Sequence, residues 1–220
     1  MTSPPGRAGT ARVEGGYVIM DVTETARIHL PLGFGRFGSA LPRRIPGTGD
    51  RLRLRPRGSS LPVSSEDFRS ALGRWASGVT IVTAAAGDRI HGMTVSAFSS
   101  VSLDPPLVLV CADKASKTLE VIEAGGCFAV HVLRAGQEAL SNTFASKKEE
   151  HRRFEEIEWR AGATGAPLLA GVLATLDCRV DAAHDAGDHV IYVGRVESAE
   201  VGEGEPLLYY HAAYRELAAG

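Results

Sequence analysis

The sequence predicts a mainly β fold with short helices, and three observations predict it. From Val79 onward, strand-like apolar runs follow one another closely, separated by turns such as Gly87-Asp88 and Asp104-Pro105-Pro106. Few helical segments lie between them, whereas parallel strands would each need a long crossover connection. Hydrophobic residues make up 44% of the chain, which is enough to fill a core. We therefore expect an antiparallel β-barrel.

Residues 1–62 differ in composition from the rest and are rich in Gly, Pro and Arg. Residues 1–63 carry a net charge of +6, whereas residues 64–220 carry −8. Apart from a strand-like pattern over residues 17–32, this part shows no sustained periodicity. We expect residues 1–62 to be a largely disordered extension and residues 63–220 to be the folded domain. Its basic residues lack interleaved aromatic residues, so we do not expect nucleic-acid binding.

Within this extension, Gly33 to Gly38 match the G-x-G-x-x-G pattern of dinucleotide-binding folds. That pattern needs a strand before it and a helix after it. Pro31 interrupts the preceding segment, and Pro42 and Pro46 prevent a helix from following. The match therefore does not indicate a Rossmann fold.

The domain is expected to open with a helix capped by Ser64 or Ser65. Acidic residues follow in its first turn, and Gly78 is the expected end. The spacing places four apolar side chains on one face, which we expect to pack against the core: Phe68, Ala71, Leu72 and Trp75.

The remaining segments are assigned from their apolar patterns and turns. Expected strands are Val79–Ala84, Ile90–Leu103, a run from Leu107, Cys127–Leu133, Val172–Val180, His189–Glu200 and Pro206–His211. Helices are expected from Ser116 to Ala124, ending at Gly125-Gly126, and from about Gln137. Alternation along Ile90–Leu103 would place Thr94, Ser96 and Phe98 on one side and Met93, Val95 and Ala97 on the other.

The cysteines Cys111, Cys127 and Cys178 lie in apolar runs, and we interpret them as buried free thiols. The seven histidines show no ligand spacing, so we expect no metal site. The chain has no apolar run of about 18 residues. It also lacks the features of a secretory signal. We expect a cytoplasmic protein that does not associate with membranes.

Four sequence blocks follow one another in a characteristic order and at a characteristic spacing: FRSALGRWASGVTIVT (68–83), HGMTVSAFSSVSLDPPLVLV (91–110), GDHVIYVGRV (187–196) and PLLYY (206–210). Together they resemble the flavin reductase-like family, the short reductase components of two-component flavin-dependent monooxygenases. The resemblance implies an antiparallel split β-barrel of the FMN-binding type, usually a homodimer with flavin near the subunit interface. It also implies FMN or FAD as cofactor, NADH or NADPH as hydride donor, and a separate monooxygenase that receives the reduced flavin.

The resemblance also implies where flavin binds. Contacts with the flavin are expected from Met93, Thr94, Val95, Ser96, Ser99 and Ser100, and contacts with its phosphate from Ser116, Lys117 and Thr118. The second group begins a helix, where free backbone N–H groups favour an anion. Phe144, Ser146 and Lys147 form a second candidate corner. Considered without the resemblance, these segments are a strand with a polar face, a serine cap and solvated lysines.

Gly187-Asp188-His189 lies between two strands and is expected to form a hairpin turn. The resemblance implies that His189 is the catalytic residue beside the nicotinamide or flavin ring, with Gly187 and Asp188 near the cofactor. Tyr210 is a further candidate, at the site or at the dimer interface. Two alternatives remain open: a flavin-binding module without reductase activity, and another split-barrel flavin oxidoreductase that acts alone.

Overall fold

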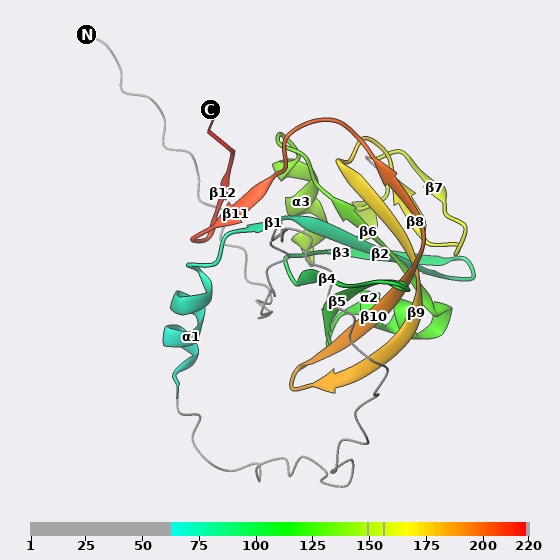
Figure 1. The fold of residues 1–220 in the computed structure, drawn as a ribbon, viewed down its shortest axis with the longest axis horizontal. Helices are drawn as coiled ribbons and strands as arrows, with labels where there is room; N and C mark the ends of the chain where they lie inside the picture. The colour runs from blue at the N-terminus through cyan, green and yellow to red at the C-terminus, as the bar shows by residue number, and fades with distance from the viewer. Residues whose placement is uncertain (1–62, 149, 156, 219–220) are drawn as a thin grey trace, which may run out of the picture.

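The computed structural model describes residues 63–148, 150–155 and 157–218 (Figure 1). The expected N-terminal extension, with the Gly33–Gly38 match, lies outside these residues. The described part is mainly β, as predicted. Its helical segments are α1 (Ser65–Leu72), α2 (Lys117–Gly125), α3 (Glu138–Ala145) and the short 3-10 helix η1 (Glu150–Arg152). None of these helices is long and apolar enough to cross a membrane.

Seven strands form the main sheet, and every neighbouring pair is antiparallel, which confirms the prediction. In spatial order they are β3 (Arg89–Val95), β2 (Thr80–Ala86), β6 (Cys127–Val132), β9 (Ala174–Ala186), β10 (His189–Val201), β5 (Pro106–Asp113) and β4 (Phe98–Leu103).

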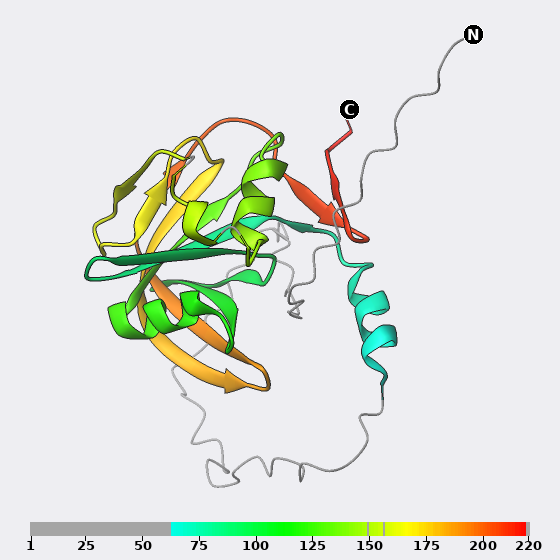
Figure 2. The ribbon, with the colours of Figure 1, turned by 180° about the vertical axis from the view of Figure 1, so that it is seen from behind.

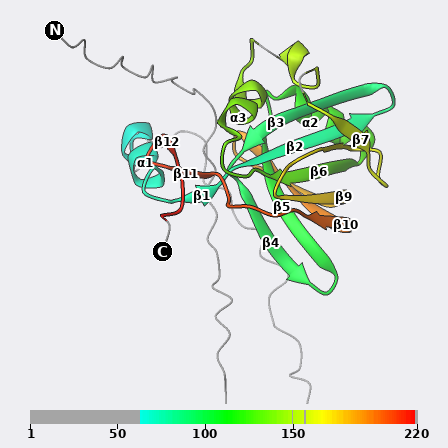
Figure 3. The same ribbon diagram turned by 90° about the horizontal axis from the view of Figure 1, so that it is seen from above.

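The two edge strands of this sheet, β3 and β4, are consecutive in the chain and are joined only by Ser96 and Ala97. Because so short a link connects opposite edges, the sheet must curl until the end of β3 meets the start of β4 (Figure 3). The Cys111 N–H on β5 donates to the carbonyl oxygen of Ala97 at 3.2 Å. The result is a barrel that is split between β3 and β4.

This break corrects the prediction of one continuous strand from Ile90 to Leu103. The chain leaves β3 after Val95 and enters the opposite edge of the sheet at Phe98. The expected alternation of side chains therefore does not continue through Ser96 and Ala97. Two small residues permit the sharp change of direction, but small residues also occur inside strands, so the pattern alone did not indicate it.

Two smaller sheets complete the fold. One contains β1 (Ser77–Gly78), β11 (Leu208–Tyr210) and β12 (Ala213–Arg215), and the other pairs β7 (Trp159–Ala161) with β8 (Pro167–Leu169). Figures 1 and 3 show the first of these sheets beside the barrel, next to α1.

Helix α1 departs from the prediction in two ways. Ser64 caps it as expected, but the helix ends at Gly73, and Gly78 lies in β1. None of its residues is buried: Phe68 is 40% exposed, and Trp75, beyond the end of the helix, is 60% exposed. Figure 2 shows α1 standing apart from the barrel. The prediction that this apolar face packs against the chain's own core is therefore wrong.

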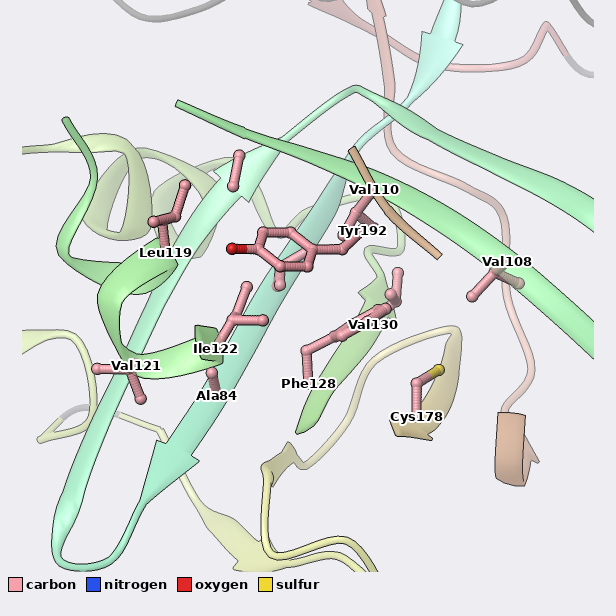
Figure 4. Close-up of a cluster of buried hydrophobic side chains, with 12 residues drawn as sticks. Ala84, Val108, Val110, Leu119, Val121, Ile122, Phe128, Val130, Cys178 and Tyr192 are labelled. Atoms are coloured by element: carbon pink, nitrogen blue, oxygen red, sulfur yellow. The ribbon is translucent and has the colours of Figure 1, made fainter. Parts of the chain in front are cut away.

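The main core lies between the sheet and α2. Figure 4 shows Tyr192 of β10 among Leu119 and Ile122 of α2 and Phe128 and Val130 of β6. Ser116 caps α2 by accepting from the Thr118 N–H at 3.1 Å, as the sequence indicated. Burial of this helix fixes its N-terminus at the end of the barrel near the split.

The three cysteines are buried and free, as predicted. Burial raises the pKa of Cys178 to about 12, so its thiol stays neutral at physiological pH. We interpret Cys178 as a packing residue.

Candidate functional site

A cavity of about 450 Å³ opens where the barrel is split. This volume lies within the range of about 300–1,000 Å³ that is typical of small-molecule sites. Its walls come from the end of β3 and the link to β4, the end of β5, the start of α2, helix α3, η1 and the β11–β12 hairpin. The site therefore depends on segments that are far apart in the sequence.

The end of β3 forms one wall and is tied to two helices. The Thr94 hydroxyl donates to the carbonyl oxygen of Ser141 on α3 at 2.7 Å. The Ser116 hydroxyl donates to the sulfur of Met93 at 3.3 Å. Both contacts hold the wall in a fixed position relative to α2 and α3, so this wall is preorganised for a ligand.

One end of the cavity is cationic. Lys117, Lys147 and Arg153 line it together with the carboxylate of Glu150, which pairs with Lys117. The hydrogen bond from Lys117 lowers the pKa of Glu150, so Glu150 is ionised at neutral pH. The N-terminus of α2 adds the partial positive charge of its backbone N–H groups. This end is suited to an anionic group.

Arg153 is 4% exposed and joins separate segments. Its Nη1 donates to the carbonyl oxygen of Gly92 at 2.6 Å, and its Nη2 donates to that of Ser146 at 2.8 Å. Nη1 also lies 3.4 Å from Nε2 of His91. Burial, followed by the charge of Arg153, lowers the pKa of His91. Because a guanidinium N–H can only donate, Nε2 of the neutral ring acts as the acceptor and Nδ1 carries the proton. Nδ1 then donates to the Thr118 hydroxyl, 2.7 Å away.

His189 reaches the cavity from the start of β10. The hairpin turn before it forms as predicted, with Gly187 at φ +67°, a conformation that favours glycine. The Nδ1 atom of His189 lies 2.7 Å from Oδ1 of Asp188, and its side chain is only 13% exposed. This hydrogen bond lowers the pKa of Asp188. Asp188 thus orients the imidazole from the solvent side.

Aromatic rings form another wall. Tyr209 and Tyr214 pack edge to face, with ring centroids 5.5 Å apart. The Tyr214 hydroxyl lies 2.9 Å from both Ser141 Oγ and Asn142 Oδ1, which anchors β12 to α3. Phe144 completes the apolar lining.

The cavity brings together many of the residues singled out from the sequence: Met93, Thr94, Val95, Ser96, Ser116, Lys117, Phe144, Lys147 and His189. Others lie outside its lining: Ser99 and Ser100 on β4, Thr118, whose hydroxyl contacts His91, and Ser146, Gly187, Asp188 and Tyr210. Sequence reasoning missed Asp113, Ser141, Glu150, Arg153 and Tyr214. Arg153 and Glu150 stand in a charged run, EEHRRFEE, where nothing separates a buried residue from solvated ones.

Comparison with known proteins identifies the family of the chain. A sequence profile described as "Flavin reductase like domain" matches residues 72–218, which is more than half of the chain. The chain belongs to the flavin reductase-like family. The reductase component of 4-hydroxyphenylacetate 3-monooxygenase from Thermus thermophilus is 45% identical over 153 residues, covering 69% of this chain and 96% of that protein. An NADH-dependent flavin reductase from a Rhodococcus species is 47% identical over 158 residues, covering 70% of this chain and 88% of that protein.

Solved structures agree with the fold of this flavin reductase. The NADH:FAD oxidoreductase SgcE6 of Streptomyces globisporus, in complex with NAD and FAD fragments, superposes with a TM-score of 0.65 at 37% identity. The match covers 70% of this chain and 92% of that chain. The native flavin reductase PheA2 gives a TM-score of 0.66 at 35% identity, covering 71% of this chain and all of the other. The split-barrel prediction is thereby confirmed.

Proposed function

We propose that this flavin reductase transfers a hydride from NADH or NADPH to FMN or FAD within the cavity at the split of the barrel. The observation that carries this proposal is the combination, in one cavity, of a preorganised polar wall, a cationic end and His189. The protein is an oxidoreductase of the flavin reductase class. The described residues fit a flavin, because such a ligand needs hydrogen-bond partners for its ring edge, an apolar bed and a cationic pocket for phosphate.

Each wall has a part in holding the ligands. We assign the flavin ring edge to Met93–Ser96 and the phosphate to the end formed by Ser116, Lys117 and Lys147. Phe144 and Tyr214 supply apolar surface beside the rings. The other predicted residues do not line the cavity, and we assign them to support of the lining residues or to contact with the nicotinamide nucleotide: Ser99, Ser100, Thr118, Ser146, Gly187, Asp188 and Tyr210.

When bound, the nicotinamide supplies the hydride and the flavin N5 atom accepts it. The protein's task is to hold the two rings in contact, and no dedicated acid–base pair is needed. His189 is fixed by Asp188 and can position the nicotinamide. We assign it the role of placing the nicotinamide ring.

We further propose that the enzyme is a cytoplasmic homodimer that supplies reduced flavin to a separate monooxygenase. The relative from Thermus thermophilus is named as the reductase component of such a system. The uncovered apolar face of α1 supports a dimer, and three free buried cysteines suit a reducing compartment.

The test is to follow oxidation of NADH and of NADPH by absorbance, with FMN or FAD added and without a partner protein. We expect rapid oxidation that depends on added flavin. Flavin binding without nicotinamide oxidation would contradict the proposal and favour a binding module. Conversion of an organic substrate by the protein alone would instead favour a self-sufficient oxidoreductase.

A further inference from the structure

The cationic end of the cavity contains its own carboxylate. Glu150, on η1, lines the cavity, and its side chain is 23% exposed. It forms an ion pair with Nζ of Lys117, directly after the Ser116 cap of α2. A phosphate placed at this helix N-terminus would meet Lys117 with its charge already paired.

Arg153 makes this arrangement unusual, because it is a buried cation that no described carboxylate neutralises through an ion pair. Among the described residues, no carboxylate forms an ion pair with Arg153, and its Nε has no hydrogen-bond partner. Its partners are two carbonyl oxygens and the neutral ring of His91. Burying an unpaired charge is costly, and such a site gains from an anion supplied by a ligand. Glu150 is the described carboxylate that acts electrostatically on Arg153.

We propose that Glu150 is an internal competitor for the flavin phosphate: its carboxylate occupies Lys117 in the cavity that Arg153 also lines, and a bound phosphate must displace it. This inference rests on the proposed function. It adds a residue whose role is to weaken flavin binding.

The physical reason is charge. A phosphate monoester carries about −1.5 to −2 at neutral pH, so a carboxylate held beside it repels it. The phosphate must also replace an existing ion pair before Lys117 becomes available. Both effects lower the affinity for phosphorylated flavins and leave the binding of the isoalloxazine ring unchanged. A reductase that hands its flavin to another protein benefits from such weakened binding.

The experiment compares dissociation constants for FMN and riboflavin, measured by fluorescence quenching. Riboflavin has the same ring system and lacks the phosphate, so the ratio of the two constants isolates the phosphate contribution. We expect Glu150→Gln to tighten FMN binding about fivefold or more, which corresponds to about 1 kcal/mol, with riboflavin binding unchanged. The matched control is Glu120→Gln, which removes the same charge from an exposed position on α2 outside the cavity lining and should leave the ratio unchanged.

Two further variants keep the inference open to refutation. In a Lys117→Gln background, Glu150→Gln should lose most of its effect on FMN, because the ion pair is already gone. Arg153→Lys keeps the charge but loses the guanidinium fork, and it should weaken FMN more than riboflavin.

Unchanged or weaker FMN binding in Glu150→Gln would overturn the inference. So would an equal change in FMN and riboflavin, which indicates a structural role. An effect confined to the NADH Michaelis constant, measured with riboflavin as acceptor, would assign the site to the nicotinamide diphosphate and also overturn it. If the wild-type protein bound neither flavin, the proposed function itself would fail, and that result is distinct from all of these.

Discussion

His189 and His131 both belong to strands of the main sheet, and their surroundings give them different chemistry. His189 stands at the start of β10 with Asp188 on one side and the cavity on the other. His131 is fully buried in β6, where Nδ1 donates to the carbonyl oxygen of Ile81 and Nε2 accepts from the Leu169 N–H. The first is available to a ligand, and the second holds segments of the barrel together.

We predict that His189→Ala impairs nicotinamide binding more than flavin binding. The residue positions a ring and is not needed as a proton donor, so its loss should raise the NAD(P)H Michaelis constant about fivefold and leave flavin affinity within about threefold. Steady-state kinetics with both substrates varied is the measurement. His184→Ala, at an exposed position of β9, is the control. Wild-type NAD(P)H dependence in His189→Ala would place the residue outside the site, and complete inactivity with normal flavin binding would show a chemical role.

We predict that His131 makes stability depend on pH. Burial lowers its pKa from 6.5 to about 4, so the unfolded chain takes up this proton before the folded chain does. The stabilising contribution is therefore complete above pH 6.5 and is lost as pH falls toward 4. Over the whole pH range, this pKa shift changes the free energy of unfolding by about 3 kcal/mol. About 2 kcal/mol of this change falls between roughly pH 7.5 and pH 5.

Denaturant unfolding at these pH values tests this prediction. His131→Gln keeps a donor and an acceptor but does not titrate, so most of the pH dependence should disappear in it, whatever its absolute stability. An equal dependence in both proteins would contradict the prediction and attribute the effect to other groups, such as His91, whose pKa is also lowered.

For single residues, the sequence predicted a position correctly where a local motif defines it. It did not predict the position of residues whose burial depends on tertiary packing. His189 follows a recognisable turn, and Ser116 begins a recognisable helix. Arg153 is buried only because η1 brings it against Gly92 and Ser146, and neither contact has a sequence signature.

Only half of the β11–β12 hairpin was predicted: β11 lies within the expected strand Pro206–His211, but the turn and β12 were not expected. Its two turn residues, His211 and Ala212, have φ values of +52° and +57°. Such turns usually contain Asn or Gly, so a His-Ala pair gave no turn signal and β12 was not predicted. The hairpin carries Tyr209 and Tyr214 into the cavity, and the His211 N–H donates to the carbonyl oxygen of Gly73 after α1.

We predict that Ala212→Gly stabilises the protein. A non-glycine residue in the left-handed region costs about 1–2 kcal/mol, and glycine avoids this cost. Part of the gain in stability is offset because glycine has more freedom in the unfolded chain, which leaves a net gain of about 0.5–1 kcal/mol. Thermal unfolding measures the effect. Ala213→Gly, one residue later in β12, is the control and should destabilise by a similar amount, since it relieves no positive φ. A lower melting temperature for Ala212→Gly would show that the turn is not strained.

At the scale of the whole molecule, the antiparallel fold was predictable because short turns between apolar runs leave few other topologies. The split could not be located, because it depends on β3 and β4 lying at opposite edges of a curled sheet. The pattern of α1 was read correctly as an apolar face, but this face does not pack against the chain's own core. Periodicity indicates that a helix has an apolar face, and it does not indicate which surface covers that face.

The apolar face of α1 is a candidate surface for contact with a second copy of the chain. Phe68 on α1 and Trp75 beyond its end are 40% and 60% exposed in the single chain. Burying a large apolar side chain contributes about 1.5–3 kcal/mol, and a two-fold interface counts each contact twice. We therefore expect a homodimer in which α1 packs against the second copy, and Phe68→Glu should shift the protein toward monomer. Light scattering after size-exclusion chromatography measures the mass, with Ser70→Glu, which adds the same charge at an exposed position of α1, as control. A monomeric wild-type protein would contradict the proposed dimer. A dimer that Phe68→Glu leaves intact but that substitutions on another surface disrupt would show that the other surface joins the copies.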